Sequence, residues 1–215
     1  MHMIKVIKKI TLVIATIFAT AFSVAAEPVE TELRKLLSDY DGFTARFSQK
    51  VTDVNDNLLH QAKGQLVFKQ PGKFRWEVTE PEQELLLSNG KSLWWYNPFL
   101  EQVSIYDAEE AVSTTPFALL VSNKDETWNK FVIEKVESGF VITPKDDDTS
   151  QVTKLAVHFD KFLLTQIVIT DRTQQTSAYV LSKHKFDKKL KHEFDFEIPE
   201  SIDIDDQRQS SVSMN

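Results

Sequence analysis

Three residues of this chain have the types and spacing that open a calcium-binding loop. Asp53, Asn55 and Asn57 match its first ligand positions, but Leu58 and Gly64 stand where the loop needs glycine and a bidentate glutamate. The other candidate metal ligands are the histidines beyond residue 26, whose spacing does not suit a metal site. These are His60, His158, His184 and His192. The sequence therefore predicts no metal and no cofactor.

The residues that could act as nucleophiles or acids are no better arranged for catalysis. There is no cysteine and no Gly-x-Ser-x-Gly motif, and five glycines leave little material for a phosphate-binding loop. Glu80, Glu82 and Glu84 are close in sequence, but an acidic turn is expected to face solvent. It then has no apolar surroundings that would raise the pKa of one carboxyl group above that of its partner, as acid–base catalysis requires. We predict that the protein is not an enzyme; a hydrolase is the unsupported alternative.

What the sequence offers instead is apolar surface, most clearly in segment 89–99. The Asn-Gly pair at 89–90 is a strong hairpin signal, because both residues tolerate the positive φ of a two-residue turn. In the strand that follows, Trp94 and Tyr96 are expected to point to one face and Trp95 to the other. Bulk on both faces predicts a sheet that is covered on both faces.

The elements that position these side chains follow from the hydrophobic period. Apolar residues at helical spacing predict helices at 29–40, 107–112 and 117–121. Alternating residues predict strands at 43–51, 59–69, 73–78, 85–87, the aromatic segment after Gly90, 102–106, 131–136, 140–144, 152–159, 163–170, 177–186 and 192–198. Gly64 suggests a bulge in the second strand. Tight turns between these strands predict a mainly β fold whose antiparallel sheet bends toward a barrel.

The helix at 117–121 is apolar on nearly every side, so it must lie against a hydrophobic surface. An ordinary packed core explains each large apolar residue taken singly. Taken together with two helical covers, they predict a concave apolar surface that can hold an acyl chain. The candidate lipid-binding residues are Phe74, Trp76, Trp94, Trp95, Phe117, Leu119 and Leu120.

Residues 1–26 have the anatomy of a secretory signal peptide. A start with three lysines precedes an apolar run, and a small-residue site predicts cleavage between Ala26 and Glu27. A retained anchor is the alternative. Because the chain has no cysteine, it lacks disulfides and a lipid attached at a cysteine. We therefore expect a soluble product in the periplasm of a Gram-negative bacterium.

The length and the net charge of the chain reduce the number of possible functions. Residues 27–208 are predicted to form one domain, followed by a disordered tail at 209–215. The 25 basic and 32 acidic residues give a net charge of −7, which becomes −10 once the three lysines of residues 1–26 are removed. An acidic surface argues against binding to nucleic acid or to an anionic membrane.

Several motifs, ordered along residues 27–208, are those of a known family. They are Phe47-Ser48-Gln49-Lys50, Gly64-x-Leu66-x-Phe68-Lys69-x-Pro71-x-x-Phe74-x-Trp76, Ser88-Asn89-Gly90-Lys91-x-Leu93-Trp94-x-Tyr96-Asn97-Pro98-Phe99-x-Glu101-Gln102, Thr115-Pro116-Phe117 and Asp205-Asp206-Gln207-Arg208. With them the chain resembles the outer-membrane lipoprotein carrier protein family, LolA. The receptor LolB shares the fold but is lipidated at a cysteine, which this chain lacks.

The resemblance implies an incomplete antiparallel β-barrel of about eleven strands closed by an α-helical lid. It implies a monomeric periplasmic chaperone, without cofactor or reaction, that takes triacylated lipoproteins from the inner-membrane ABC transporter LolCDE and delivers them to LolB. It places cargo handling on Phe74 and Trp76, and the lid on Phe117 and Leu120.

One position departs from the family. Well-known members carry an arginine, thought to latch the lid, where this chain has Gln70. An amide gives a weaker bond than a charge-assisted one, so the latch is expected to be looser, or Lys69 or Lys73 replaces it. The rival to the carrier is a lipocalin-like binder or sensor of free fatty acids or other small apolar ligands, since the same residues would build its cavity.

Overall fold

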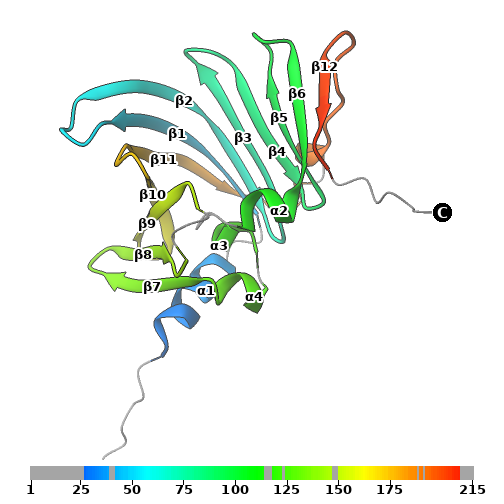
Figure 1. The fold of residues 1–215 in the computed structure, drawn as a ribbon. Helices are drawn as coiled ribbons and strands as arrows, with labels where there is room; N and C mark the ends of the chain where they lie inside the picture. The colour runs from blue at the N-terminus through cyan, green and yellow to red at the C-terminus, as the bar shows by residue number, and fades with distance from the viewer. Residues whose placement is uncertain are drawn as a thin grey trace, which may run out of the picture.

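A single curved sheet of twelve strands dominates the part of the chain that the structure describes (Figure 1). The structure is a computed structural model and describes residues 27–38, 42–113, 118–122, 124–146, 150–187, 189–190 and 192–208. The strands follow the spatial order β12-β6-β5-β4-β3-β2-β1-β11-β10-β9-β8-β7. They are β1 (Phe43–Thr52), β2 (Leu58–Lys69), β3 (Lys73–Glu80), β4 (Glu84–Asn89), β5 (Ser92–Asn97), β6 (Gln102–Asp107), β7 (Phe131–Val136), β8 (Gly139–Pro144), β9 (Val152–Asp160), β10 (Leu163–Asp171), β11 (Thr176–Phe186) and β12 (Asp203–Asp206).

The sheet is open, with β7 and β12 at its two edges. Strands β1 to β11 pair antiparallel, which confirms the predicted incomplete antiparallel barrel. The strand β12 is an addition to the prediction and pairs parallel with β6, so that Asp203 lies opposite Gln102. Parallel partners need a long connection, and here all the elements from α2 to the segment after β11 lie between β6 and β12 in the chain.

Two turns show how local sequence shapes the strands. The calcium-like residues at 53–57 close a β1–β2 turn, in which the Asp53 carboxylate accepts hydrogen bonds from the backbone N–H groups of Asn55 and Asn57 at 2.9 Å. The Asn-Gly hairpin joins β4 and β5 as predicted, but only Gly90 has a positive φ, of 89°. The two loop residues are therefore Gly90 and Lys91, and the Asn89 side chain caps the turn by accepting the N–H groups of Lys91 and Ser92.

The helices gather at the end of the sheet where β6 stops (Figure 1). They are α1 (Val29–Ser38), α2 (Ala108–Ser113), α3 (Ala118–Val121) and α4 (Asp125–Trp128). The first three match predicted helices, whereas α4 is not among them. Asp107 caps α2 by accepting the N–H groups of Glu109 and Glu110. Within the described residues, no helix has the length and apolar character needed to cross a bilayer.

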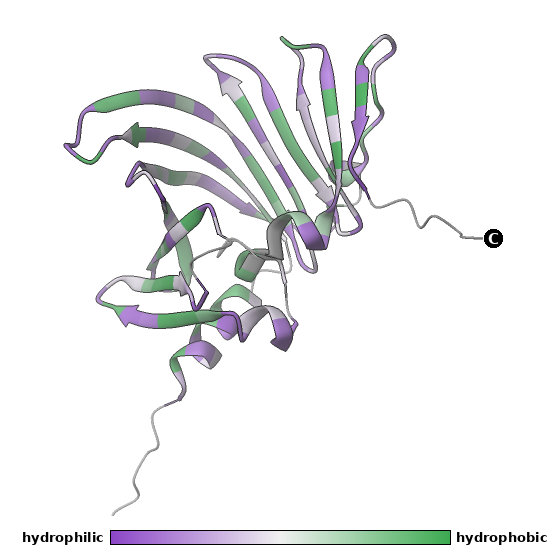
Figure 2. Ribbon diagram, viewed as in Figure 1, coloured by the Kyte–Doolittle hydropathy of each residue, from purple (hydrophilic) through white to green (hydrophobic). Residues whose placement is uncertain are grey.

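The inner face of the sheet and the helices bury one continuous core. Strand alternation sends Phe43 and Phe47 of β1 inward, and the pairing register carries this face across β2 to Phe74 and Trp76 of β3. Green and purple segments alternate along these strands in Figure 2, as expected for strands with two different faces. Leu33 and Leu37 of α1 and two leucines of α3 close the core from the helix side.

The outer face of β3 to β5 is covered by the segment that follows β11. The Phe196 ring centre lies 6.2 Å from that of Trp94 and 5.6 Å from that of Tyr96. The outer face is therefore covered here, as predicted, whereas the inner face of β5 leaves Trp95 47% exposed. The predicted strand at 192–198 is wrong: the segment holds the 3₁₀ helix η1 (His192–Phe194) and then irregular chain. Its alternating apolar residues pack onto strands that are already paired, so it finds no hydrogen-bonding partner strand.

Candidate functional site

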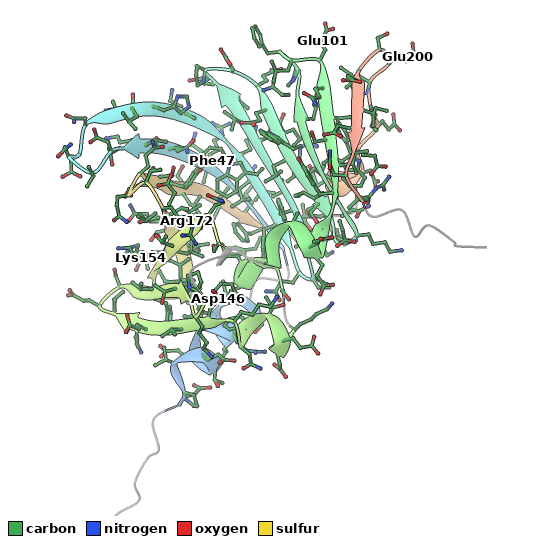
Figure 3. All side chains as sticks on the ribbon, viewed as in Figure 1. Phe47, Glu101, Asp146, Lys154, Arg172 and Glu200 are labelled. Atoms are coloured by element: carbon green, nitrogen blue, oxygen red, sulfur yellow. The ribbon has the colours of Figure 1, made fainter. Side chains whose placement is uncertain are left out.

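Three aromatic rings form a wall across the middle of the inner face. The ring centre of Trp76 lies 5.0 Å from that of Phe47 and 4.7 Å from that of Tyr179, and the ring centres of Phe47 and Tyr179 are 5.8 Å apart. Phe47 lies within the curve of the sheet (Figure 3) and opposite Gly64 on β2, which leaves room for its ring. This wall separates two pockets, and Trp76 lines both.

The first pocket, here called the helix-end pocket, lies between the sheet and the helices α1 and α3. Its lining is apolar and consists of Leu37, Phe43, Leu66, Phe68, Trp76, Leu120, Leu164 and Ile167. Its volume is about 20 Å³, which holds little more than one water-sized group. Leu119 and Leu120 fill the rest of the space, with exposures of 0% and 4%. An acyl chain can enter this end only if α3 moves.

The second pocket, here called the rim pocket, lies toward the β3–β4 turn, away from the helices. It has a volume of about 390 Å³, within the range of small-molecule sites, about 300 to 1,000 Å³. Its lining residues are Gln49, Trp76, Val78, Glu84, Leu86, Trp95 and Tyr179. The labelled Glu101 marks the neighbouring β5–β6 turn at the same end of the sheet in Figure 3.

Three polar side chains interrupt the apolar lining of the rim pocket. The Gln49 amide N–H donates to the Tyr179 hydroxyl at 2.8 Å, and the Trp95 indole N–H donates to a carboxylate oxygen of Glu84. Glu84 was expected to face solvent with the rest of its acidic turn, and this expectation is wrong. As the first residue of β4 it shares the inner face with Leu86, so it is half-buried against an apolar wall.

Burial of the Tyr179 hydroxyl shifts its pKa, and this shift can be measured by titration. Loss of solvation, aided by the nearby Glu84 charge, raises the pKa of Tyr179 to about 12 although a hydrogen bond with Ser177 acts in the opposite direction. Since the unfolded pKa is about 10, the folded protein keeps this proton while the unfolded chain loses it, so the associated stability is present below about pH 10 and is lost as pH rises toward 12. Phenolate absorbance of the folded protein should show one late step that Tyr179→Phe removes. If the variant instead loses a step near the ordinary pKa, the phenol is not buried.

The helices that cover the helix-end pocket are tied to one another at the surface. The Arg34 guanidinium of α1 pairs with Asp125 of α4 at 2.8 Å and lies 4.5 Å from the centre of the Trp128 ring. The Lys124 ammonium bonds both carboxylate oxygens of Glu109 at 2.6 Å, which joins the two ends of the α2–α3 segment. Exposed ion pairs contribute little to stability, so these contacts position the helices without fixing them in place.

The structure brings together most of the described candidate residues and separates one. Trp76 and Leu120 line the helix-end pocket, and Trp95, 47% exposed, lines the rim pocket. Phe74, 1% exposed, is buried in the same core beside them. Trp94 points to the outer face, against Phe196, so it does not join the others. Alternation along β5 is the physical reason, because adjacent residues cannot share a face.

Five residues of the rim pocket were not among the candidates: the apolar Val78 and Leu86 and the polar Gln49, Glu84 and Tyr179. Gln49 and Tyr179 are 130 positions apart and meet because β1 pairs with β11. No spacing within the sequence reports such a contact. Glu84 was considered only as part of an acidic turn, and strand alternation from Leu86 was the signal that could have placed it on the inner face.

The roles of several predicted residues remain predictions. Phe117, the Thr115-Pro116 start of its helix, the cleavage residue Ala26, the rest of the signal peptide and the tail at 209–215 lie outside the described residues. Glu27 is the first described residue and is exposed. Gln70 is half-buried in the turn between β2 and β3. The segment it was predicted to latch includes 114–117, so the latch is not tested.

Comparison with known proteins gives consistent matches along the chain. A family profile described as "Outer membrane lipoprotein carrier protein LolA" matches residues 38–197. Outer-membrane lipoprotein carrier proteins of Shewanella sediminis and Shewanella amazonensis are 37% and 38% identical to this chain over 183 and 191 residues. The two alignments cover 84% and 87% of this chain and 87% and 92% of those proteins.

A solved structure adds a likeness of fold. The crystal structure of an uncharacterized conserved protein from Thermus thermophilus aligns with a TM-score of 0.50 at 10% identity, covering 83% of this chain and 97% of that one. At this identity the likeness concerns the fold alone. Family membership rests on the profile and on the sequence relatives. The chain belongs to the outer membrane lipoprotein carrier protein family, LolA.

Proposed function

We propose that this chain is a periplasmic chaperone that carries lipoproteins by enclosing their acyl chains between the curved sheet and its helical lid. One observation supports this most directly. Leu119 and Leu120 of a four-residue helix are buried against the apolar inner face of the sheet, and Leu120 lines the helix-end pocket. A helix this short can be displaced by a ligand that takes over its apolar contacts. Membership of a family described as a carrier of lipoproteins agrees with this role and names no reaction.

The energy of acyl chains in water explains why a cover is needed. Each buried CH₂ is worth about 0.8 kcal/mol, so a chain of about 15 carbons costs on the order of 10 kcal/mol to expose. Such a chain has to stay covered while it crosses water. In the empty carrier α3 occupies the helix-end pocket, so part of the binding free energy is used to displace it. This cost keeps binding weak enough for release to a receptor.

The route of the cargo is part of the same proposal. A signal peptide at 1–26, cleaved between Ala26 and Glu27, delivers the chain to the periplasm. There the monomer receives triacylated lipoproteins from LolCDE and passes them to LolB. The lid that opens on loading comprises α3 with Phe117, Leu119 and Leu120, and Phe74, Trp76 and Trp95 contact the acyl chains. Gln70, Lys69 or Lys73 holds the lid when the carrier is empty.

The test uses the exported form of the chain, purified from the periplasmic fraction of a Gram-negative host. Incubated with inner-membrane vesicles that contain LolCDE, a lipoprotein and ATP, the chain should recover the lipoprotein in a soluble one-to-one complex. The same lipoprotein without acyl groups is the control and should not bind. Recovery of free lipid without lipoprotein would support the fatty-acid binder instead. A chain that stays in the cytoplasm would contradict the proposed export.

A further inference from the structure

The rim pocket contains a carboxylate that ordinary acyl-chain binding does not need. Glu84 lies among Trp76, Val78, Leu86 and Trp95. These apolar side chains can contact an acyl chain whatever group it carries at its end, so they do not distinguish one acyl ligand from another. The Trp95 indole N–H donates to one Glu84 oxygen, which fixes the carboxylate at the pocket wall. Glu84 is only half-buried, so it keeps contact with solvent while part of the carboxylate lies beside apolar side chains where a ligand would pass.

The polar groups of this pocket are mainly acceptors of hydrogen bonds. Gln49 uses its amide N–H on Tyr179, and Glu84 uses one oxygen on Trp95. Within the part of the chain that the structure describes, this leaves the Gln49 carbonyl oxygen, its second N–H and the second Glu84 oxygen for a ligand, so acceptors outnumber donors. The Tyr179 hydroxyl is already engaged with Gln49 and Ser177. A ligand that brings N–H donors and no negative charge complements this surface, whereas a carboxylate would meet a like charge.

We propose that Glu84 makes the rim pocket selective for acyl chains joined to an uncharged amide, as at an N-acylated lipoprotein N-terminus, and against acyl chains that end in a carboxylate. The inference rests on the proposed function and adds a discrimination to it. The amide N–H donates to Gln49 or Glu84 while the chain lies along Trp76 and Leu86. A free fatty acid of equal length has the same apolar contacts but places its carboxylate beside Glu84, so specificity comes from repulsion.

The experiment compares the wild-type protein with Glu84→Gln, which removes the charge and keeps the shape. The ligands are hexadecanoate, hexadecanamide and a triacylated lipopeptide with an uncharged peptide, measured by competition in tryptophan fluorescence below their micelle concentrations. Hexadecanoate should bind Glu84→Gln about tenfold more tightly than the wild type, the factor expected from one partly solvated charge pair. Affinities for the amide and the lipopeptide should change by less than about threefold, since both remain hydrogen-bonded.

Glu82→Gln is the matched control, because this exposed carboxylate belongs to the same β3–β4 turn and does not line the pocket. It should leave all three affinities unchanged. A second measurement needs no variant: in the wild type, the ratio of hexadecanoate to hexadecanamide affinity should rise with salt, because salt screens the repulsion.

The outcomes separate the inference from the proposed function. If the wild type fails to bind the lipopeptide, the proposed function fails. If the wild type binds it but Glu84→Gln leaves the hexadecanoate affinity unchanged, or Glu82→Gln raises it equally, only the inference is overturned. A salt-independent ratio overturns the inference in the same way, even where the variant does not fold.

Discussion

Replacing Leu120 with glutamate is expected to weaken lipoprotein binding by about a hundredfold while the sheet stays folded. Leu120 is 4% exposed in the helix-end pocket, where it lies with Leu37 and Phe43. A carboxylate there costs about 3 kcal/mol or more, which corresponds to about a hundredfold in affinity. The charge opposes both the closed lid and a lid laid over an acyl chain, so α3 remains in water and the cargo is left uncovered.

The matched control is Leu59→Glu, the same replacement at a leucine of β2 that is 51% exposed. Lipopeptide affinity measured by fluorescence and sheet content measured by circular dichroism test both variants. Leu59→Glu should retain binding and fold. Wild-type lipopeptide affinity in Leu120→Glu would show that α3 is not the lid, and loss of the circular dichroism signal of the sheet would show that Leu120 belongs to the structural core.

Gly64→Ala is expected to lower the free energy of unfolding by about 3 kcal/mol, at the upper end of what overpacking usually costs. A β-carbon at this position would lie 2.0 Å from the carbonyl oxygen of Glu77 and 2.5 Å from the Phe47 ring. Gly64 also lies beside a register shift between β2 and β3, but the extra residue is Thr79 of β3, so the bulge that was predicted in β2 lies on the neighbouring strand. The methyl group must therefore push β3 away or displace Phe47 from the aromatic wall, so lipopeptide binding should weaken as well.

Gln65→Ala tests whether the effect is specific to position 64, because Gln65 is the next residue of β2 and is exposed. It should change stability by less than about 0.5 kcal/mol, as most surface substitutions do. Urea unfolding with linear extrapolation measures both variants. Equal midpoints for Gly64→Ala and the wild type would mean that the backbone relaxes around the methyl group and that the aromatic wall does not depend on glycine.

The strands were predictable because each has one face in the core, and this gives a local period of two. The observed bounds of β1 and β3 are close to the predicted ones, and Gly64 indicated where a bulge lies, although its extra residue, Thr79, is on β3 and not on β2. The same rule failed at 192–198, where apolar residues also alternate. Alternation reports burial on one side and says nothing of whether a partner strand is available, and in this segment the neighbouring strands are already paired.

The residues of the site were predictable only in part, for a related reason. The sequence correctly placed Trp94 and Trp95 on opposite faces, because this follows from one strand alone. Which face is the inner one depends on the curvature of the sheet and on the segment around Phe196 that covers its outer side. Trp94 was therefore included among the lipid-binding candidates although it lies outside the hollow.

The sequence by itself determined the antiparallel sheet, the apolar helix that covers it and the family of lipoprotein carriers. Each of these can be recognised from residues that are close together in the chain. Only the tertiary structure decided that Trp76 lies between two pockets, that Gln49 contacts Tyr179, and that Glu84 lines the rim pocket beside apolar side chains. Those contacts join strands distant in sequence. They depend on register and curvature, which arise from the packing of the whole sheet and not from any single segment.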